Sequence, residues 1–183
     1  MTDPAPLSAS GAIEVRISDI SQLFNTLDPF PFPERDLDKD AEEFIVGWAR
    51  ELPRGQSLCI VIHLPSAETA KQHANQLRES MNRYFEYRAS VIDRDIKELF
   101  RFGRTSLLIG LGVLALGLTA ARLISAGMNP TPIQRLLQEG FIIASWVANW
   151  KPIEIFLYDW WPLVRRRNLY RRLAQAQVEL KPY

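Results

Sequence analysis

The sequence predicts a membrane protein with two parts: a small domain of α/β or α+β class, followed by a transmembrane helical hairpin. Two observations predict the hairpin, namely an uncharged run from Thr105 to Ala121 and a second apolar region that begins at Gly140. A third observation predicts the domain, because residues 12–104 alternate strand-type and helix-type hydrophobic patterns. The chain of 183 residues is long enough for both parts.

The charges divide the chain at the same place. Residues 1–104 hold 13 Lys/Arg and 17 Asp/Glu, a net charge of −4, whereas residues 105–183 hold 9 and 4, a net charge of +5. An acidic domain followed by an apolar region and a basic tail is typical of a protein at an anionic lipid surface. This distribution of charge argues against nucleic-acid binding, because a nucleic-acid-binding protein would carry its basic patch on the folded domain.

The beginning of the chain, residues 1–11, is rich in Pro, Ser and Ala and predicts a disordered leader. It has neither a basic start nor an apolar core and therefore lacks the features of a signal peptide. We expect residues 12–104 to stay in the cytoplasm as the soluble domain.

The domain is expected to begin with a strand and a short helix. Apolar and polar residues alternate from Ile13 to Ile17, as in a half-buried strand. Ser18 or Asp19 then caps a brief helix that runs to about Leu27. A proline-rich segment that follows excludes regular structure.

A second helix and a second strand follow. Apolar residues at helical spacing between Leu37 and Leu52 predict a helix that ends before Pro53. The uninterrupted apolar run from Leu58 to Leu64 predicts a strand buried on both faces. Because a helical crossover joins them, the two strands are expected to be parallel neighbours, with an edge left open for another subunit.

From Ser66 onward the composition favours one long helix that runs unbroken into the membrane. Its first part has apolar residues at 4-3-4-3 spacing and is expected to pack against the small domain. We expect the first transmembrane helix at 105–125, a short periplasmic loop at 126–135, the second transmembrane helix at 136–158, and a basic amphipathic cytoplasmic tail at 159–183.

The second span has two interpretations. In the first, residues 140–158 cross the membrane, and Lys151 and Glu154 pair at i,i+3 spacing inside it. In the second, residues 133–150 cross, and residues 151–164 lie along the interface with their tryptophans at headgroup depth. Both interpretations predict two spans.

The placement of Lys and Arg predicts the orientation. Five lie in the twenty residues before the first span and six in the tail after the second, against two in the connecting loop and its flanks. Cytoplasmic segments carry the excess of positive charge, so both termini are expected in the cytoplasm and the spans in a bacterial inner membrane.

The residues that we single out as candidates lie around the end of the second span. Lys151, Glu154 and Asp159 are ionisable groups at or near membrane depth, where such groups are functional candidates by default. The residues that follow are expected to contact the interface and anionic lipids: Trp160, Trp161, Arg165, Arg166 and Arg167.

No catalytic pattern is visible. The sequence has no nucleophile elbow, P-loop, dinucleotide fingerprint or zinc-protease motif. The single cysteine, Cys59, excludes an intramolecular disulfide, and His63 and His73 have no third ligand at metal spacing. We expect no enzymatic activity, no cofactor and no metal.

Two segments, AEEFIVGWARELP (Ala41–Pro53) and EIFLYDWWPLVRRR (Glu154–Arg167), resemble a set of conserved bacterial inner-membrane proteins of about this size to which no function is assigned. The resemblance covers most of residues 12–180 and implies a location in the bacterial inner membrane. The sequence therefore predicts a membrane-anchored accessory or scaffold protein with a protein partner or a homo-oligomeric state. The alternative is a homo-oligomeric transport or channel subunit with Lys151 and Glu154 as its polar site.

Overall fold

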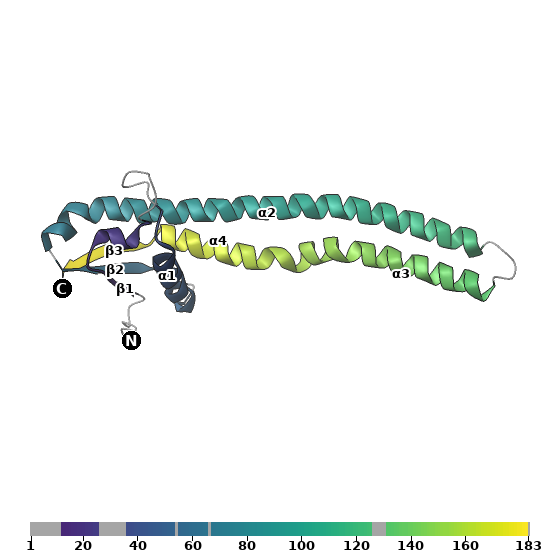
Figure 1. Ribbon diagram of the computed structural model, residues 1–183, viewed down its shortest axis with the longest axis horizontal. Helices are drawn as coiled ribbons and strands as arrows, with labels where there is room; N and C mark the ends of the chain where they lie inside the picture. Colours follow the sequence, from purple (N-terminus) through teal and green to yellow (C-terminus); the bar gives the residue numbers. More distant parts are fainter. Residues whose placement is uncertain (1–11, 26–35, 54, 66, 126–130, 183) are drawn as a thin grey trace. The chain divides into compact units, whose positions relative to one another are not determined.

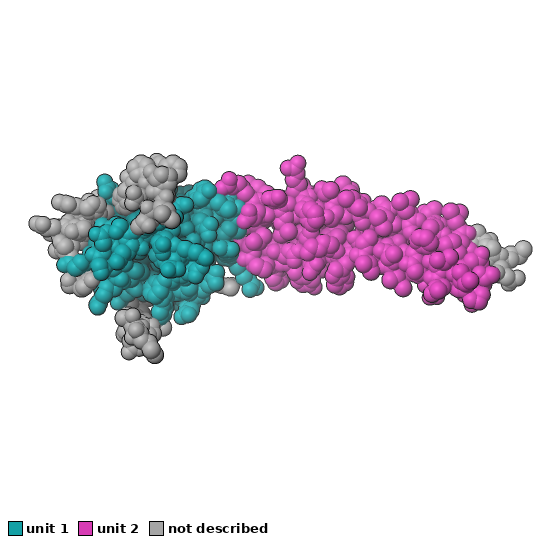
Figure 2. All heavy atoms as spheres, viewed as in Figure 1, with its two compact units in different colours: residues 1–92, 165–183 teal, residues 93–164 magenta. Residues whose placement is uncertain are grey.

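The computed structural model describes residues 12–25, 36–53, 55–65, 67–125 and 131–182 (Figure 1). The predicted leader and the proline-rich segment lie outside these residues. The chain divides into two compact units, which Figure 2 shows in different colours. Unit 1 consists of residues 1–92 and 165–183, and unit 2 of residues 93–164. The fold is mostly helical, with one small parallel sheet.

The sheet of unit 1 has three parallel strands in the order β1-β2-β3: β1 (Ala12–Arg16), β2 (Cys59–Leu64) and β3 (Gln177–Pro182) (Figure 1). The predicted parallel pairing of the first two strands is confirmed, with Ile13 opposite Ile60. Ile60, Val61 and Ile62 of the central strand are all at most 3% exposed, so β2 is buried on both faces as predicted.

The third strand corrects the prediction that no strand of the same chain covers the second edge of β2. β3 lies within residues 159–183, which we expected to form a basic tail, and Val178 is opposite Ile60. β3 has few apolar residues, and charged Glu179 and Lys181 flank Leu180. Such a composition suits an edge strand, but it also resembles a solvated tail, and this explains why the pattern did not reveal it.

Two short helices connect the first two strands. Asp38 caps α1 (Lys39–Glu51), its carboxylate accepting the Asp40 N–H at 2.9 Å. Asp19 caps the 3₁₀ helix η1 (Ile20–Leu23) in the same way. This helix ends earlier than predicted, because Phe24 forms an isolated antiparallel bridge with Leu37.

The long helix predicted from Ser66 is present as α2 (Ala67–Ser125). In unit 1 its buried side chains include Leu77, Met81 and Phe85, each fully enclosed. Leu77 and Met81 belong to the predicted 4-3 spacing, which continues at Tyr84, 8% exposed, whereas Phe85 lies one residue further on. All four pack in the core of the small domain.

The rest of the chain is helical up to β3. A capping box formed by Thr131 and Gln134 starts α3 (Pro132–Glu154), so this helix begins inside the segment that we expected to be a loop. A π-helical turn, η2 (Ile155–Asp159), joins α3 to α4 (Trp160–Ala174) without a break.

Among the described residues, α2 is the one helix that is long and apolar enough to cross a membrane. Its most apolar stretch has a mean hydropathy of 2.2, and only 17% of that stretch is buried, whereas the core helix of a soluble protein would be mostly enclosed. This favours a membrane association. By the same standard α3 falls short, since Arg135 and Glu139 precede its apolar run and Lys151 and Glu154 follow it.

Candidate functional site

A line of glycines on α2 packs against α3 and the turn η2 within unit 2. Gly103, Gly110 and Gly117 repeat every seventh residue, and each is buried. A Cβ atom at Gly117 would lie 1.8 Å from the Ser145 Oγ, and one at Gly110 would lie 2.7 Å from the Asn149 Oδ1. A seven-residue repeat keeps one helix face on its partner, and small residues let the two backbones approach closely.

The polar groups of this packing face are satisfied internally. Asn149 is only 6% exposed, and its side-chain amide donates to the Gly110 carbonyl at 3.0 Å and to the Ser145 carbonyl at 2.9 Å. The Ser145 hydroxyl donates to the Phe141 carbonyl at 2.6 Å. A hydrogen bond between helices of this kind is typical of membrane helix pairs.

The outward faces of the same helices are apolar. Leu116 and Leu123 of α2 are each 73% exposed, and Ile133 and Trp150 of α3 are each 70% exposed. A soluble monomer rarely exposes many large apolar side chains on the same pair of helices. Along these helices, Ser145 and Asn149 are buried and large apolar side chains are exposed, an arrangement that suits a lipid environment.

The predicted polar site is assembled around Lys151. Its ammonium group donates to Glu154 and to Asp159, with both N–O distances 3.1 Å. In a regular α-helix each residue rotates the side-chain direction by about 100°. After eight residues Asp159 would therefore point about 80° away from the direction of Lys151. The wider π-helical turn η2 lies between them and reduces this offset.

The two predicted interface tryptophans differ in their surroundings. Trp160 is half-buried, 6.4 Å from the ring of Phe100, and its indole N–H donates to the Phe156 carbonyl at 2.9 Å. Trp161 is 49% exposed. Together with Phe156 these rings form an aromatic cluster next in sequence to the Lys151 group.

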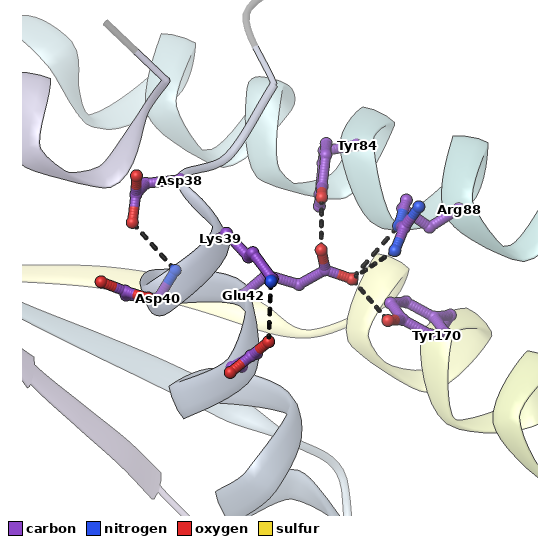
Figure 3. Close-up of polar contacts among 8 residues, drawn as sticks. Asp38, Lys39, Asp40, Glu42, Tyr84, Arg88 and Tyr170 are labelled. Carbon is purple, nitrogen blue, oxygen red and sulfur yellow. Dashed lines mark hydrogen bonds and ion pairs between the residues drawn. The ribbon is translucent and has the colours of Figure 1, made fainter.

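A second polar cluster, which the sequence analysis missed, lies in unit 1 around Glu42 of α1 (Figure 3). Glu42 is only 8% exposed, and its carboxylate accepts hydrogen bonds from the hydroxyl of Tyr84 at 2.7 Å and from that of Tyr170. The guanidinium of Arg88 approaches the same carboxylate through two nitrogens, each at 3.1 Å. The cluster thus joins α1, α2 and α4.

The cluster shifts the pKa values of its members. Burial raises the pKa of the Glu42 carboxyl, but the hydrogen bonds from Tyr170 and Tyr84 and the charge of Arg88 outweigh it, so the net shift is downward. Burial and the hydrogen bond to Glu42 raise the pKa of Tyr84. At neutral pH the carboxylate is therefore ionised and the phenol is protonated.

An open pocket of about 590 Å³ lies beside this cluster. Four basic and two acidic side chains line it, together with Val46, Gly47 and Tyr170. Arg166, one of the predicted candidates, lines it with its guanidinium carbon 5.7 Å from the centre of the Tyr170 ring.

The other predicted arginines have different positions. Arg165 is exposed and outside the pocket, whereas Arg167 is half-buried and donates to the Asn168 side chain at 3.1 and 3.2 Å. The structure therefore does not bring the three arginines into one patch. Consecutive helical residues point in different directions, and only Arg166 lies over the tyrosine.

No family model matches the chain, and comparison with curated proteins and with solved structures finds no similar one.

Proposed function

We propose that this chain is a membrane-anchored interaction protein that crosses a bacterial inner membrane twice and holds its α/β domain in the cytoplasm. The observation that carries the proposal is the pairing of β2 with β3 in one sheet, combined with the apolar helix α2 between them.

The sheet limits how many times the chain crosses. β2 precedes α2 and β3 follows α4, yet their backbones are hydrogen-bonded in register from Cys59 to Leu64. Two paired strands must lie on the same side of a membrane. If α2 crosses it, the chain must cross back before β3, and α3 is the segment available for the return.

The composition of α3 fits a return span despite its charges. Its uncharged run, Gly140–Trp150, is shorter than the roughly 20 residues of an ordinary span. The contacts of Asn149 with Gly110, however, pair it with α2, and the three charges of the Lys151 group partly compensate one another. The excess of Lys and Arg outside the hairpin supports cytoplasmic termini.

The edges of the sheet support a role of the domain in interaction, as an accessory or scaffold subunit. β1 and β3 are edge strands, and the polar clusters of the described residues show no nucleophile beside a general base. Anionic lipids and a protein partner, or a second copy of the chain, are the expected ligands.

Labelling of introduced cysteines in intact cells tests the topology. In the Cys59→Ser background, a cysteine at Asn129 is expected to react with an impermeant reagent from outside, and one at Gln175 only after lysis. Reaction of position 129 only after lysis would contradict the hairpin. Reaction of position 175 from outside would contradict the shared side of the two strands.

The second candidate function is a homo-oligomeric transport or channel subunit, and the exposed Lys151 group favours it. Lys151 is 57% exposed in its side chain, so in an oligomer it can face a neighbouring copy. Two spans do not enclose a pore alone, so the candidate requires assembly. A monomer in mild detergent and in native membrane extracts would exclude it.

A further inference from the structure

The pocket of unit 1 contains an excess of positive charge. Its lining includes Lys39, Arg50, Arg88 and Arg166 against Glu42 and Glu43. Arg88 is paired with Glu42, and Lys39 lies 3.9 Å from Glu43. Within the described part of the chain, neither Arg50 nor Arg166 has a carboxylate partner. Two guanidinium groups of the lining are therefore available to a ligand.

The position of Gly47 is a second, independent observation. It lies in the interior of α1, where a glycine costs about 1 kcal/mol relative to alanine. No atom of the described chain lies within 4 Å of where its Cβ would be, so packing within the protein does not require a glycine. A glycine at such a position leaves room for something outside the chain to approach the helix backbone.

We propose that this pocket binds a phosphate-type oxyanion, which rests on the floor formed by Gly47 and is held by Arg50 and Arg166. Arg50 follows Gly47 by three residues and so shares its helix face. Arg166 is held in place over the Tyr170 ring, so less of its freedom is lost on binding. The planar donor fork of arginine matches phosphate oxygens, and the lining's excess of two positive charges suits a mono- or dianion.

Glu42 and its partners support the site indirectly. The charge of Arg88 compensates that of the Glu42 carboxylate, and the two tyrosine hydroxyls donate hydrogen bonds to its oxygens. An incoming anion therefore meets a compensated carboxylate rather than a free one. The volume of about 590 Å³ accommodates a phosphorylated small molecule or a phospholipid headgroup.

The proposal does not depend on the number of membrane spans, because every residue that lines the pocket belongs to unit 1. Its test therefore fails or succeeds separately from the cysteine-labelling test of topology.

Isothermal titration of the full chain in a zwitterionic detergent tests it with two probes. One is inorganic phosphate, and the other is short-chain phosphatidylglycerol below its micellar concentration. We expect saturable binding of at least one probe. Binding of phosphate alone assigns a soluble ligand, and binding of the lipid alone assigns a headgroup. Absence of saturable binding of both overturns the proposal.

Three variants locate the site. The pair Arg50→Gln with Arg166→Gln is expected to weaken binding roughly tenfold or more. Gly47→Leu should also weaken it, since the side chain fills the floor while helix propensity improves. The pair Arg16→Gln with Arg83→Gln removes the same number of charges from unit 1, outside the pocket, and should change binding by less than about twofold. Equal losses in this control pair and in the Arg50 and Arg166 pair, or unchanged binding in Gly47→Leu, would overturn the proposal; circular dichroism verifies that each variant is folded.

Discussion

Glu42 joins three helices of unit 1 through one carboxylate. Its contacts reach residues 42 and 128 positions away in the sequence, on α2 and α4. A buried carboxylate is stable only when its oxygens are hydrogen-bonded and its charge is compensated, and Tyr84, Tyr170 and Arg88 meet both requirements. The residue is therefore a point where the parts of the domain are fixed to one another.

Replacement of Glu42 by glutamine should destabilise unit 1 by about 2 kcal/mol, because it leaves Arg88 without its partner and replaces charge-assisted hydrogen bonds by weaker ones. Denaturant unfolding of the full chain in detergent, followed by near-ultraviolet circular dichroism, measures the change. Glu43→Gln is the matched control, because the Glu43 side chain is 69% exposed and lies 3.9 Å from the Lys39 ammonium. A similar loss in both variants would contradict this role of Glu42.

The lowered pKa of Glu42 also predicts a dependence of stability on pH. A carboxyl group whose pKa falls on folding stabilises the folded state fully above its ordinary pKa, here 4.5, and loses this contribution as the pH falls through the folded value. The stability difference between the natural chain and Glu42→Gln should therefore be largest at pH 6–7 and shrink below about pH 4. A difference that stays constant from pH 7 to pH 3 would contradict the shift.

At the scale of elements, the two helices of unit 2 are matched by small residues at a seven-residue interval. Gly110 and Gly117 face α3 and Gly103 faces the turn η2, whereas nothing lies within 4 Å of the Cβ position of Gly112. Helix α2 thus contains three glycines that close packing requires, and one, Gly112, that it does not require.

Gly117→Ala should lower the stability of the helix pair by about 1–3 kcal/mol, because the new methyl group would overlap the Ser145 Oγ. Gly112→Ala provides the control and should have no such effect. Adding Ser145→Gly to Gly117→Ala removes the overlapping atom and should restore most of the loss. The melting temperature in detergent measures all three, and equal melting temperatures of the two alanine variants would exclude close packing at Gly117.

The Lys151 group predicts how the end of α3 relates to the membrane. If the span includes it, Lys151→Leu leaves two carboxylates uncompensated, each costing about 2.5–3.5 kcal/mol at the centre of a span. The amount of protein in the membrane fraction should fall. Adding Glu154→Leu should restore it only in part, because Asp159 remains, and adding Asp159→Asn should restore more.

If residues 151–164 instead lie in the interface, water screens all three groups, and each single substitution should change the amount of inserted protein little. Unchanged levels of Lys151→Leu would therefore assign the group to the interface. That result would also remove the polar path that a channel function requires.

At the scale of the whole molecule, unit 1 is built from residues on both sides of unit 2 in the sequence. Val178 of β3 is 4% exposed and opposite Ile60. Val178→Asp should destabilise unit 1 by several kcal/mol, because it places a charge in the core, but it should leave membrane insertion unchanged. Protease sensitivity reports on the domain, and resistance to alkaline extraction reports on the membrane part. Glu179→Gln, in the same strand but exposed, is the control.

The sequence predicted those parts of the fold that depend on local pattern. The apolar runs identified β2 and the apolar part of α2, and helical spacing identified α1. The Glu42 cluster could not be predicted in this way, because its members are far apart in the sequence and none of them lies in a recognisable sequence motif. The glycine repeat is visible in the sequence, but its partner residues, Ser145 and Asn149, follow only from the antiparallel packing of α3.

The parallel arrangement of β3 beside β2 has a consequence for biosynthesis. β2 leaves the ribosome before α2 and α3 are made, and β3 leaves after both. Throughout that interval one edge of β2 has unpaired backbone donors and acceptors, which are prone to wrong pairing and to recognition by proteases. The sheet is therefore completed only in chains whose helices α2, α3 and α4 have been synthesised. In the proposed topology, completion of the sheet also requires that the chain has crossed the membrane and returned, so chains that stall in between would keep this edge of β2 unpaired.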